Sequence, residues 1–398
     1  MGRLAIKGET DAGIPVISGR GEGLAPRIAA LDGFRALAIL LVLFYHYTVR
    51  WAPPLDPAPH LPSGRMFDGF VPLEYGWFGV ELFFVISGFV ILMTLERCRN
   101  LPDFLLRRFA RLWPAMAAAA ALTALVMALA GPSDWRTGRL DYLTSVLFLS
   151  PNITSALWHG AAVKWVDGAY WSLWVEVRFY GLAAFFFLAA RRNFIKPWLV
   201  FFAAALLLHY LAAYLALPLV ARALDLLCFP KYLPYFMLGV CAYRFTSGER
   251  KWAVTGAILA AAAILHDAIL AQGIFEQSSP VICVVLVLML FALIGLFLAD
   301  SPWLAPFRSA PLVILGQASY SLYLVHEYIG VALMRRAVDA GLPYLAVLPA
   351  MIVLIAAVSL AMFHFIEVPA KAWILRHAQG VVAGAERRAP RLSFRPAG

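Results

Sequence analysis

Apolar stretches long enough to cross a lipid bilayer recur from residue 31 to residue 368, with no soluble block between them. Of the 398 residues, 62% are hydrophobic and 14% are charged. Soluble domains carry roughly 45–50% apolar and about 25% charged residues. The chain is therefore expected to be an all-α polytopic membrane protein, in which one membrane domain takes up nearly the whole length.

The apolar runs predict about ten transmembrane helices. Residues 1–27 are expected to form a disordered cytoplasmic lead, residues 28–376 the transmembrane domain, and residues 377–398 a basic cytoplasmic tail. The apolar piece 142–149 is too short to span and is interpreted as re-entrant or interfacial. The predicted helices lie at residues 29–49, 77–95, 113–130, 169–190, 197–218, 224–245, 252–271, 280–299, 312–334 and 343–367.

The distribution of Lys and Arg among the loops predicts the orientation. Basic loops stay on the cytoplasmic side of a membrane. Both termini are therefore expected in the cytoplasm, with Arg35 toward the cytoplasm and His46 toward the outer face. The basic segments are 97–111, 191–196, 244–251 and the tail, whereas 50–75, 131–168 and 266–279 are close to balanced.

Charge and cysteine usage exclude several classes of function. The net charge of +10 does not indicate binding to nucleic acid, because much of the excess lies in short loops and in the tail. The four cysteines form no C-x-x-C pair and are expected to be small core residues. The chain also lacks H-E-x-x-H, G-x-S-x-G, Walker and dinucleotide-binding motifs, so we expect neither a metal site nor bound nicotinamide.

The stretch Leu31–Tyr47, LDGFRALAILLVLFYHY, carries a cation and an imidazole inside an apolar helix. Arg35 and His46 are eleven residues apart, so they fall within about 20° of one helix face and roughly 16 Å apart along the axis. Ionisable side chains are costly in lipid, so this shared inward face is predicted to be a functional site. The alternative is a structural arginine and a packed histidine.

Other charged residues are candidate partners for these two. Glu81, on the second predicted helix, lies at roughly the depth of His46 and could orient the imidazole. Arg107, Arg108 and Arg111 lie at the cytoplasmic level. They are either a cluster that sets the membrane topology or a clamp for phosphate groups.

Two further apolar segments contain polar residues. The segment 171–180, WSLWVEVRFY, holds a glutamate and an arginine two residues apart. These do not share a helical face, so each is expected to find a partner on another helix. The segment 317–327, QASYSLYLVHE, holds two serines, which can simply let helices approach. His326 and Glu327 in the same segment favour a functional role.

These segments, in this order, resemble the motifs of the acyltransferase-three family of integral membrane O-acyltransferases. The similarity extends from Leu31 to about Arg376. The family commonly has a second acidic residue and a polar residue where this chain has Val177 and Arg178. The matching motifs are LDGFRALAIL followed by His46, FGVELFFVISGFVI at 78–91, RRFARLWP at 107–114, WSLWVEVRFY at 171–180, SYSLYLVH at 319–326 and E-x-P at 367–369.

The resemblance implies an enzyme of the bacterial cytoplasmic (inner) membrane that transfers an acyl group, most often acetyl. The implied donor is cytoplasmic acyl-CoA (acetyl-CoA). The implied acceptor is a hydroxyl group of a cell-surface or exported glycan or of a lipid-linked sugar. No metal is implied, and membrane lipids surround the protein.

The resemblance also suggests roles for the candidate residues. His46 is interpreted as the general base, or as a carrier of the acyl group, with Glu81 or Glu176 orienting it. Arg35 is expected to reach the pantetheine or phosphate end of acyl-CoA. The phosphates are expected to dock on Arg107, Arg108 and Arg111, and the substrate site is expected to include Trp171, Ser172, Tyr180, Ser319 and His326.

Two other classes of protein remain open. A transporter or flippase for a lipid-linked or small-molecule substrate would also contain intramembrane charges and broken helices. Transporters often carry internal repeats, and this chain shows no two-fold repeat, which argues against that class. A structural component of a polysaccharide-assembly complex is the third interpretation. Turnover of acetyl-CoA by the purified protein distinguishes the enzyme from both.

Overall fold

The computed structural model describes residues 24–388 except for positions 54, 57, 59, 62–65, 191–192, 271 and 273–277. The described residues form helices and turns and contain no strand, which confirms the all-α class. The disordered lead predicted for residues 1–27 lies largely outside the described residues, but α1 already begins at Leu24. The basic residues 191–192 and the end of the tail, 389–398, also lie outside them.

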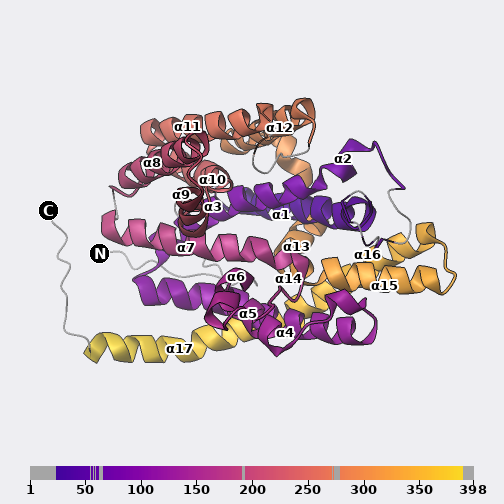
Figure 1. The fold of residues 1–398 in the computed structure, drawn as a ribbon. Helices are drawn as coiled ribbons and strands as arrows, with labels where there is room; N and C mark the ends of the chain where they lie inside the picture. Colours follow the sequence, from indigo (N-terminus) through magenta and orange to yellow (C-terminus); the bar gives the residue numbers. More distant parts are fainter. Residues whose placement is uncertain are drawn as a thin grey trace.

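Eight helices of the described chain are long and apolar enough to cross a membrane. They pack into one elongated bundle (Figure 1). Their positions agree with the apolar runs of the sequence. They are α1 (Leu24–Tyr45), α3 (Gly79–Arg97), α4 (Leu101–Leu129), α7 (Trp171–Ala190), α8 (Ile195–Tyr214), α11 (Arg250–Ile269), α12 (Pro280–Leu298) and α16 (Tyr344–Met362).

The two remaining apolar runs form broken helices. The run 224–245 is interrupted near Pro230 and Pro234, because proline cannot donate a backbone hydrogen bond inside a helix. The run 312–334 is broken twice, and His326 lies at the second break. The pieces are α9 (Pro218–Leu227), α10 (Leu233–Thr246), α13 (Ala310–Gln317), α14 (Ser319–Val325) and α15 (Glu327–Asp339).

The basic run lies inside a helix, whereas the sequence placed it in the connection before one. α4 begins directly after Asn100, whose side chain caps the helix by accepting a hydrogen bond from the backbone N–H of Asp103 at 2.9 Å. Arg108 and Arg111 are therefore three residues apart on one helix and share a face.

Two π-helical turns interrupt the long helices. One, His46–Arg50, follows α1, and the other, Phe363–Glu367, joins α16 to α17 (Val368–Arg388). Such turns are rare and occur often at functional sites. α17 lies along the edge of the bundle (Figure 1) and stays helical through residues 377–388, which were expected to belong to the tail. The connections hold the short helices α2 (Val71–Glu74), α5 (Arg139–Val146) and α6 (Pro151–Leu157).

Close packing around α1 and α3 organises the bundle. α1 lies against α3 and α13. A Cβ atom on Gly316 of α13 would lie 1.8 Å from the carbonyl oxygen of Asp32 on α1. A Cβ atom on Gly239 of α10 would lie 1.9 Å from the carbonyl oxygen of Val85 on α3. Only glycine permits such contacts. Small residues at helix interfaces allow the backbones of membrane helices to approach closely.

The bundle has two ends, which we name after the two ionisable residues of α1. The His46 end contains the His46–Arg50 turn and the start of α7. The Arg35 end contains Arg35 and the first half of α4.

Gly239→Ala should destabilise the bundle, because the new methyl group would meet the backbone of α3. Overpacking of this kind typically costs about 1–3 kcal/mol, so the thermal unfolding midpoint of the purified protein should fall. Gly295→Ala on α12 is the matched control, since nothing lies within 4 Å of that position. Replacing an uncrowded helical glycine by alanine should be neutral or stabilising. Equal midpoints for the two variants would contradict the close contact between α3 and α10.

Candidate active site

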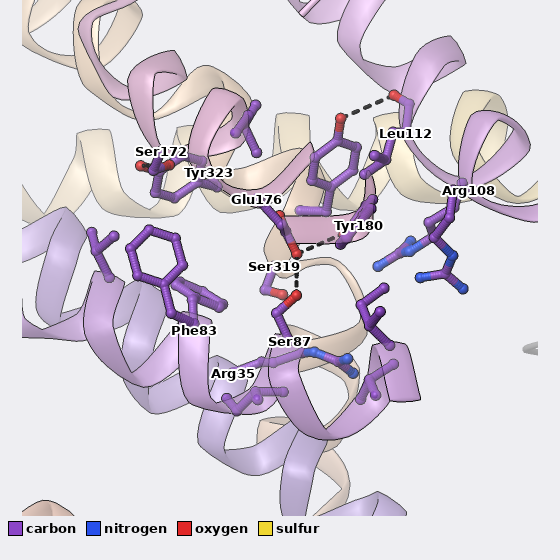
Figure 2. Close-up of a pocket in the computed structure, with 18 residues that line it drawn as sticks. Arg35, Phe83, Ser87, Arg108, Leu112, Ser172, Glu176, Tyr180, Ser319 and Tyr323 are labelled. Atoms are coloured by element: carbon purple, nitrogen blue, oxygen red, sulfur yellow. Dashed lines mark hydrogen bonds between the residues drawn. The ribbon is translucent and has the colours of Figure 1, made fainter. Parts of the chain in front are cut away.

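A polar cavity lies between α1, α3, α4, α7 and α14 (Figure 2). Its volume is about 110 Å³, whereas one water molecule needs roughly 10–15 Å³. The cavity can therefore hold several waters or a slender chain. Residues from widely separated sequence motifs meet here, and the polar ones are Arg35, Ser87, Arg108, Arg111, Ser172, Glu176, Tyr180, Ser319, Tyr320 and Tyr323.

Three guanidinium groups line this cavity, each in a different environment. Arg35 forms an ion pair with Asp32 at 2.6 Å, one turn before it on α1. Arg111 pairs with the buried Glu367, which ends the π-helical turn before α17. The Nε atom of Arg108 is buried without a hydrogen-bond partner among the described residues. A guanidinium group whose buried N–H donor has no acceptor favours an anionic ligand.

Arg107, the third arginine of the predicted clamp, does not line the cavity. Its Nε donates to Asp103 at 2.8 Å, and its side chain is 40% exposed. Lys371 of α17 lies close enough to the arginines for their positive charges to act on its ammonium group. The cavity arginines are therefore Arg35, Arg108 and Arg111, and Lys371 adds a nearby cation that the sequence did not predict.

Glu176 places a carboxylate opposite the arginines. Its Oε1 atom accepts hydrogen bonds from Ser87 Oγ and from the hydroxyl of Tyr180, both at 2.7 Å. Figure 2 shows the three side chains converging in the cavity. Glu176 is therefore engaged on the cavity side of α7 and is not the carboxylate that contacts His46.

The cavity ends at Ser172 and Tyr323. The hydroxyl of Tyr323 lies 2.7 Å from Ser172 Oγ and 2.9 Å from the carbonyl oxygen of Ala169. Phe83 packs edge-on against the tyrosine ring, with the ring centroids 6.0 Å apart. Tyr323 also contacts the ring of His326, at 5.4 Å between centroids. Tyr323 therefore separates the cavity from a second polar cluster.

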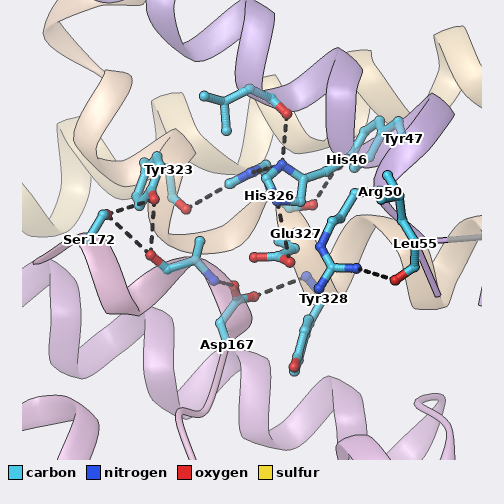
Figure 3. A network of polar contacts seen from close by, with 12 residues as sticks. His46, Tyr47, Arg50, Leu55, Asp167, Ser172, Tyr323, His326, Glu327 and Tyr328 are labelled. Carbon is cyan, nitrogen blue, oxygen red and sulfur yellow. Dashed lines mark hydrogen bonds and ion pairs between the residues drawn. The ribbon is translucent and has the colours of Figure 1, made fainter. Parts of the chain in front are cut away.

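His46 and His326 meet in this second cluster, with ring centroids 4.9 Å apart (Figure 3). His46 Nδ1 lies 2.8 Å from the carbonyl oxygen of Val42 and 3.3 Å from His326 Nε2. His326 Nδ1 lies 2.8 Å from the carbonyl oxygen of Tyr323. A carbonyl oxygen only accepts, so we assign the hydrogen of each neutral ring to Nδ1. His46 Nε2 then keeps its lone pair.

Glu327 faces this lone pair. Its Oε1 atom lies 3.4 Å from His46 Nε2, and the residue is buried. This distance is too long for a strong hydrogen bond, so Nε2 stays available to a substrate hydroxyl. A carboxylate this close stabilises the imidazolium that forms when His46 takes a proton. The arrangement therefore suits general-base chemistry at His46.

Asp167 completes the cluster, and the sequence did not single it out. It is fully buried and accepts hydrogen bonds from the backbone N–H groups of Ala169 and Tyr328, both at 3.0 Å. Its carboxyl group lies beside that of Glu327. Two adjacent buried carboxylates do not both hold a full charge unless a cation is near, and Arg50 lies next to Glu327 (Figure 3). Asp167 thus fixes the position of Glu327.

A buried aromatic and ionic cluster fixes the loop after α1 beside these residues. His60 lies 2.6 Å from Asp56 through Nδ1 and 3.1 Å from Asp134 through Nε2. Its ring stacks on Trp135, which stacks on Tyr328. Burial raises the pKa of Asp56, but hydrogen bonds from the backbone and ring of His60 outweigh it, so this pKa lies below its ordinary value. The carboxylate therefore stays ionised and holds the loop in place.

Glu81 does not orient His46 as the sequence suggested. It is buried, and its charge acts on Tyr232 and Tyr235 at the start of α10. Its Oε2 atom has no hydrogen-bond partner among the described residues. Glu81 lies on the side of α3 that faces α10. Trp171 also turns away from the cavity and packs against Tyr232, with the ring centroids 5.2 Å apart.

Arg35 and His46 both face the protein interior, and their side chains are 23% and 13% exposed. They lie in adjacent polar regions and do not line one continuous wall. Arg35 lines the cavity, whereas His46 lies beyond Tyr323. Of the residues predicted to bind substrate, Ser172, Tyr180 and Ser319 line the cavity, and His326 contacts His46.

Comparisons with known proteins found one matching family model and two related proteins. A family model described as an acyltransferase domain matches residues 28–364. The peptidoglycan O-acetyltransferase OatA of Listeria monocytogenes is 27% identical, and the putative peptidoglycan O-acetyltransferase YrhL of Bacillus subtilis is 30% identical, each over 129 residues. Each match covers 31% of this chain and 17% of the relative. No solved structure matches the chain.

Glu367→Gln should destabilise the protein, because it leaves the partly buried guanidinium of Arg111 without a charged partner. Removing one partner of a fully buried ion pair typically costs about 3–5 kcal/mol. Only Glu367 is fully buried here, so we expect a smaller cost that still lowers the thermal unfolding midpoint. Asp339→Asn is the control, since its partner Arg335 is 3.9 Å away and both side chains are exposed. Pairs of that kind contribute roughly 0–1 kcal/mol. Equal midpoints would contradict a stabilising pair between α4 and the α17 junction.

Proposed function

The chain belongs to the family described as the acyltransferase domain, and we propose that it is a membrane O-acetyltransferase that moves an acetyl group from acetyl-CoA to a hydroxyl group of a cell-surface glycan. The observation that carries this proposal is the buried His46–Glu327 pair directly behind an arginine-lined cavity. The two relatives named above are, by name, a peptidoglycan O-acetyltransferase and a putative peptidoglycan O-acetyltransferase, which supports an acetyl group and a glycan acceptor.

The donor binds from the Arg35 end of the bundle. CoA carries several phosphate groups at one end of a long arm, and guanidinium groups are suited to bind phosphates. Arg108, with its unused Nε donor, is the principal contact, and Arg35 and Arg111 flank it. Arg35 and His46 are roughly 16 Å apart along the axis of α1. A pantetheine arm held at the arginines would span this distance and direct its thioester toward His46.

This assignment places the Arg35 end at the cytoplasm. The basic segments 97–111 and 244–251 favour that side, and acyl-CoA is a cytoplasmic metabolite. Both described termini of the bundle then face the cytoplasm, in the inner membrane of a bacterium. The His46 end faces outward, toward the glycan.

Acyl transfer needs a base at the acceptor hydroxyl. His46 Nε2 takes the hydroxyl proton while the hydroxyl oxygen attacks the carbonyl carbon of the thioester. The carbon–sulfur bond then breaks, and the CoA thiolate leaves and recovers a proton from the imidazolium. Glu327, 3.4 Å from Nε2, stabilises the imidazolium between these two steps. His326 holds His46 in the required tautomer through its contact with Nδ1.

Tyr323 lies between the donor cavity and the base. Its hydroxyl is held by Ser172 and by the carbonyl oxygen of Ala169, and its ring lies between the cavity and His326. Rotation of this side chain opens a path for the thioester, and its return closes the path to water. Tyr323 therefore acts as a gate between the donor cavity and the polar cluster around His46.

His46→Ala and Glu327→Gln should both lower kcat for acetyl transfer. Positioned acid–base groups contribute about 10²–10⁴-fold, so losses in that range are expected in proteoliposomes supplied with acetyl-CoA and glycan. The apparent KM for acetyl-CoA should change little, because both residues lie away from the arginines. A His46→Ala protein with wild-type turnover would end the proposal.

Gly168→Ala tests the same geometry without removing a functional group. The new Cβ atom would lie 2.8 Å from Glu327 Oε1, so the carboxylate must move and kcat should fall. Gly181→Ala is the matched control on α7, because nothing lies within 4 Å of that position. We expect Gly181→Ala to retain wild-type kcat. Equal activity in the two variants would contradict a catalytic need for the position of Glu327.

Arg108→Ala should raise the apparent KM for acetyl-CoA. Hydrogen bonds to charged groups contribute about 1.5–3 kcal/mol, which corresponds to a change of roughly 10- to 100-fold. Arg107→Ala is the control, because Arg107 is half-exposed, paired with Asp103 and outside the cavity. If both variants raise the KM equally, the phosphates do not bind inside the cavity.

A further inference from the structure

A second hollow lies on the opposite face of α7 from the donor cavity. Its volume is about 330 Å³, and it lies between α7, the α9–α10 connection and the segment that precedes α7. Successive residues of α7 divide between the two sites, since Ser172 and Glu176 line the donor cavity whereas Trp171 and Trp174 line this hollow. We call it the tryptophan groove and define it by Trp165, Trp171, Trp174, Arg178, Asp225 and Lys231.

Aromatic rings form the walls of the tryptophan groove. Trp165, Trp171 and Trp174 are each only partly buried, so part of each side chain remains accessible. The ring of Trp171 packs against the ring of Tyr232, with 5.2 Å between the ring centroids, and this contact holds the indole ring in place. Phe229 also lines the groove and has a positive φ of 41°, a backbone conformation that costs energy for an aromatic residue. Strain of this kind is typical of functional sites.

Arg178 is fixed at the edge of the groove. Its Nη1 donates to the carbonyl oxygens of Asp225 at 2.5 Å and Leu226 at 3.0 Å, in the last turn of α9. Its guanidinium also lies over the rings of Trp174 and Phe229, at 5.0 and 4.9 Å from their centroids. A cation suits the negative end of a helix. Arg178 thus joins α7 to the last turn of α9 at the edge of the groove.

Two charged side chains offer polar contacts to a ligand. Asp225 is exposed, and Lys231 is partly buried. Neither forms an ion pair with another residue in the part of the chain that the structure describes. A carboxylate and an ammonium group beside aromatic faces can accept from and donate to the same ligand. The groove therefore combines flat apolar surfaces with separate donors and acceptors, the usual composition of a small-molecule site.

We propose that the tryptophan groove binds a saccharide unit of the acceptor glycan. A pyranose ring has C–H faces that pack on aromatic rings and a rim of hydroxyl groups that both donate and accept hydrogen bonds. The C–H faces of the sugar would pack on Trp174 and Trp171, and its hydroxyl groups would form hydrogen bonds with Asp225 and Lys231. This inference rests on the proposed function, and it assigns to the acceptor a subsite distinct from the one at His46.

The position of the groove suits a glycan of which another unit is acetylated. Trp165 lies in the groove, and Asp167, two residues later, contacts the Glu327 cluster. Two residues of extended chain span at most about 7 Å, so the groove and the carboxylates beside His46 are held by one short segment. A glycan anchored in the groove must extend past Asp167 and Glu327 before one of its units reaches His46. Binding energy from such a remote unit positions the reacting hydroxyl.

An aromatic belt at the membrane surface is the other source of clustered tryptophans. Belt residues place their rings at the lipid headgroups. Here three tryptophans converge on one hollow that also holds Arg178, Asp225 and Lys231. We therefore favour a saccharide, and we treat lipid headgroups as an outcome of the test.

Binding is measured on the purified full-length protein in lipid nanodiscs, without acetyl-CoA and without sugar-based detergent. The probes are chitotetraose and tetragalacturonate, one neutral and one acidic, titrated by calorimetry. We expect at least one probe to bind the wild-type protein with a Kd of about 1 mM or tighter. Trp174→Ala should raise this Kd about tenfold, because it removes a stacking surface. Lys231→Gln should raise it about fivefold, because a neutral amide is a weaker donor to the sugar hydroxyl groups than an ammonium group.

Trp158→Ala is the matched control. Trp158 lies in the segment that precedes α7, as Trp165 does, and it is 54% exposed. It does not line the groove. Its variant should bind the probe with the wild-type Kd. The thermal unfolding midpoint of each variant shows that it is folded, and Lys231→Gln keeps the test independent of the tryptophan packing.

Three results would overturn the inference. The first is that neither tetrasaccharide binds the wild-type protein. The second is that the Trp174→Ala and Lys231→Gln variants bind the probe as tightly as the Trp158→Ala variant does. The third is that occupancy of the groove depends only on the phosphatidylglycerol content of the nanodisc. Because no donor is present, the binding result does not depend on acetyl transfer. A protein that transfers acetyl groups to glycan with unchanged acceptor KM in both groove variants would refute the groove alone. A protein that binds the tetrasaccharide through Trp174 but transfers nothing would refute the proposed function alone.

Discussion

A charge inside an apolar bundle must find a partner, and this requirement determines how the polar core is built. Removing an ion from water costs several kcal/mol even after the protein relaxes. Arg111 forms an ion pair with Glu367, and Arg244 forms ion pairs with Glu96 and Glu249. Arg108 is the contrast, since it forms no ion pair with an acidic residue among the described residues, and its buried Nε atom makes no hydrogen bond there. A site for an anion explains why the bundle tolerates such a group.

Much of the fold could be predicted from the sequence, because each long apolar run must span the bilayer by itself. The eight long helices follow these runs closely. The break at His326 could not be predicted, because no proline marks it and the apolar pattern continues across it. The start of α4 was also missed, because a dense run of charges resembles a loop, whereas the cap at Asn100 begins a helix there.

The sequence predicted many of the residues of the candidate site, but it predicted less well which of their side chains contact one another. Position along a helix gives an approximate depth for a residue, which is why the sequence suggested Glu81 as a partner for His46. Depth does not give the direction in which a side chain points, and Glu81 lies on the side of α3 that faces α10. Glu327 contacts His46 instead, because the break at His326 turns it inward. Asp167 lies in a connecting segment, where a carboxylate is ordinary and gives no signal.

In the proposed mechanism, the arginine-lined cavity and the polar cluster around His46 form a single path for the acyl donor. An electron cryomicroscopy structure of the full-length protein with CoA bound tests it most directly. The account predicts phosphate density beside Arg108 and Arg35, and a pantetheine arm whose sulfur passes Tyr323 toward His46. Phosphates bound elsewhere, or a thiol that ends away from His46 with Tyr323 unmoved, would contradict it.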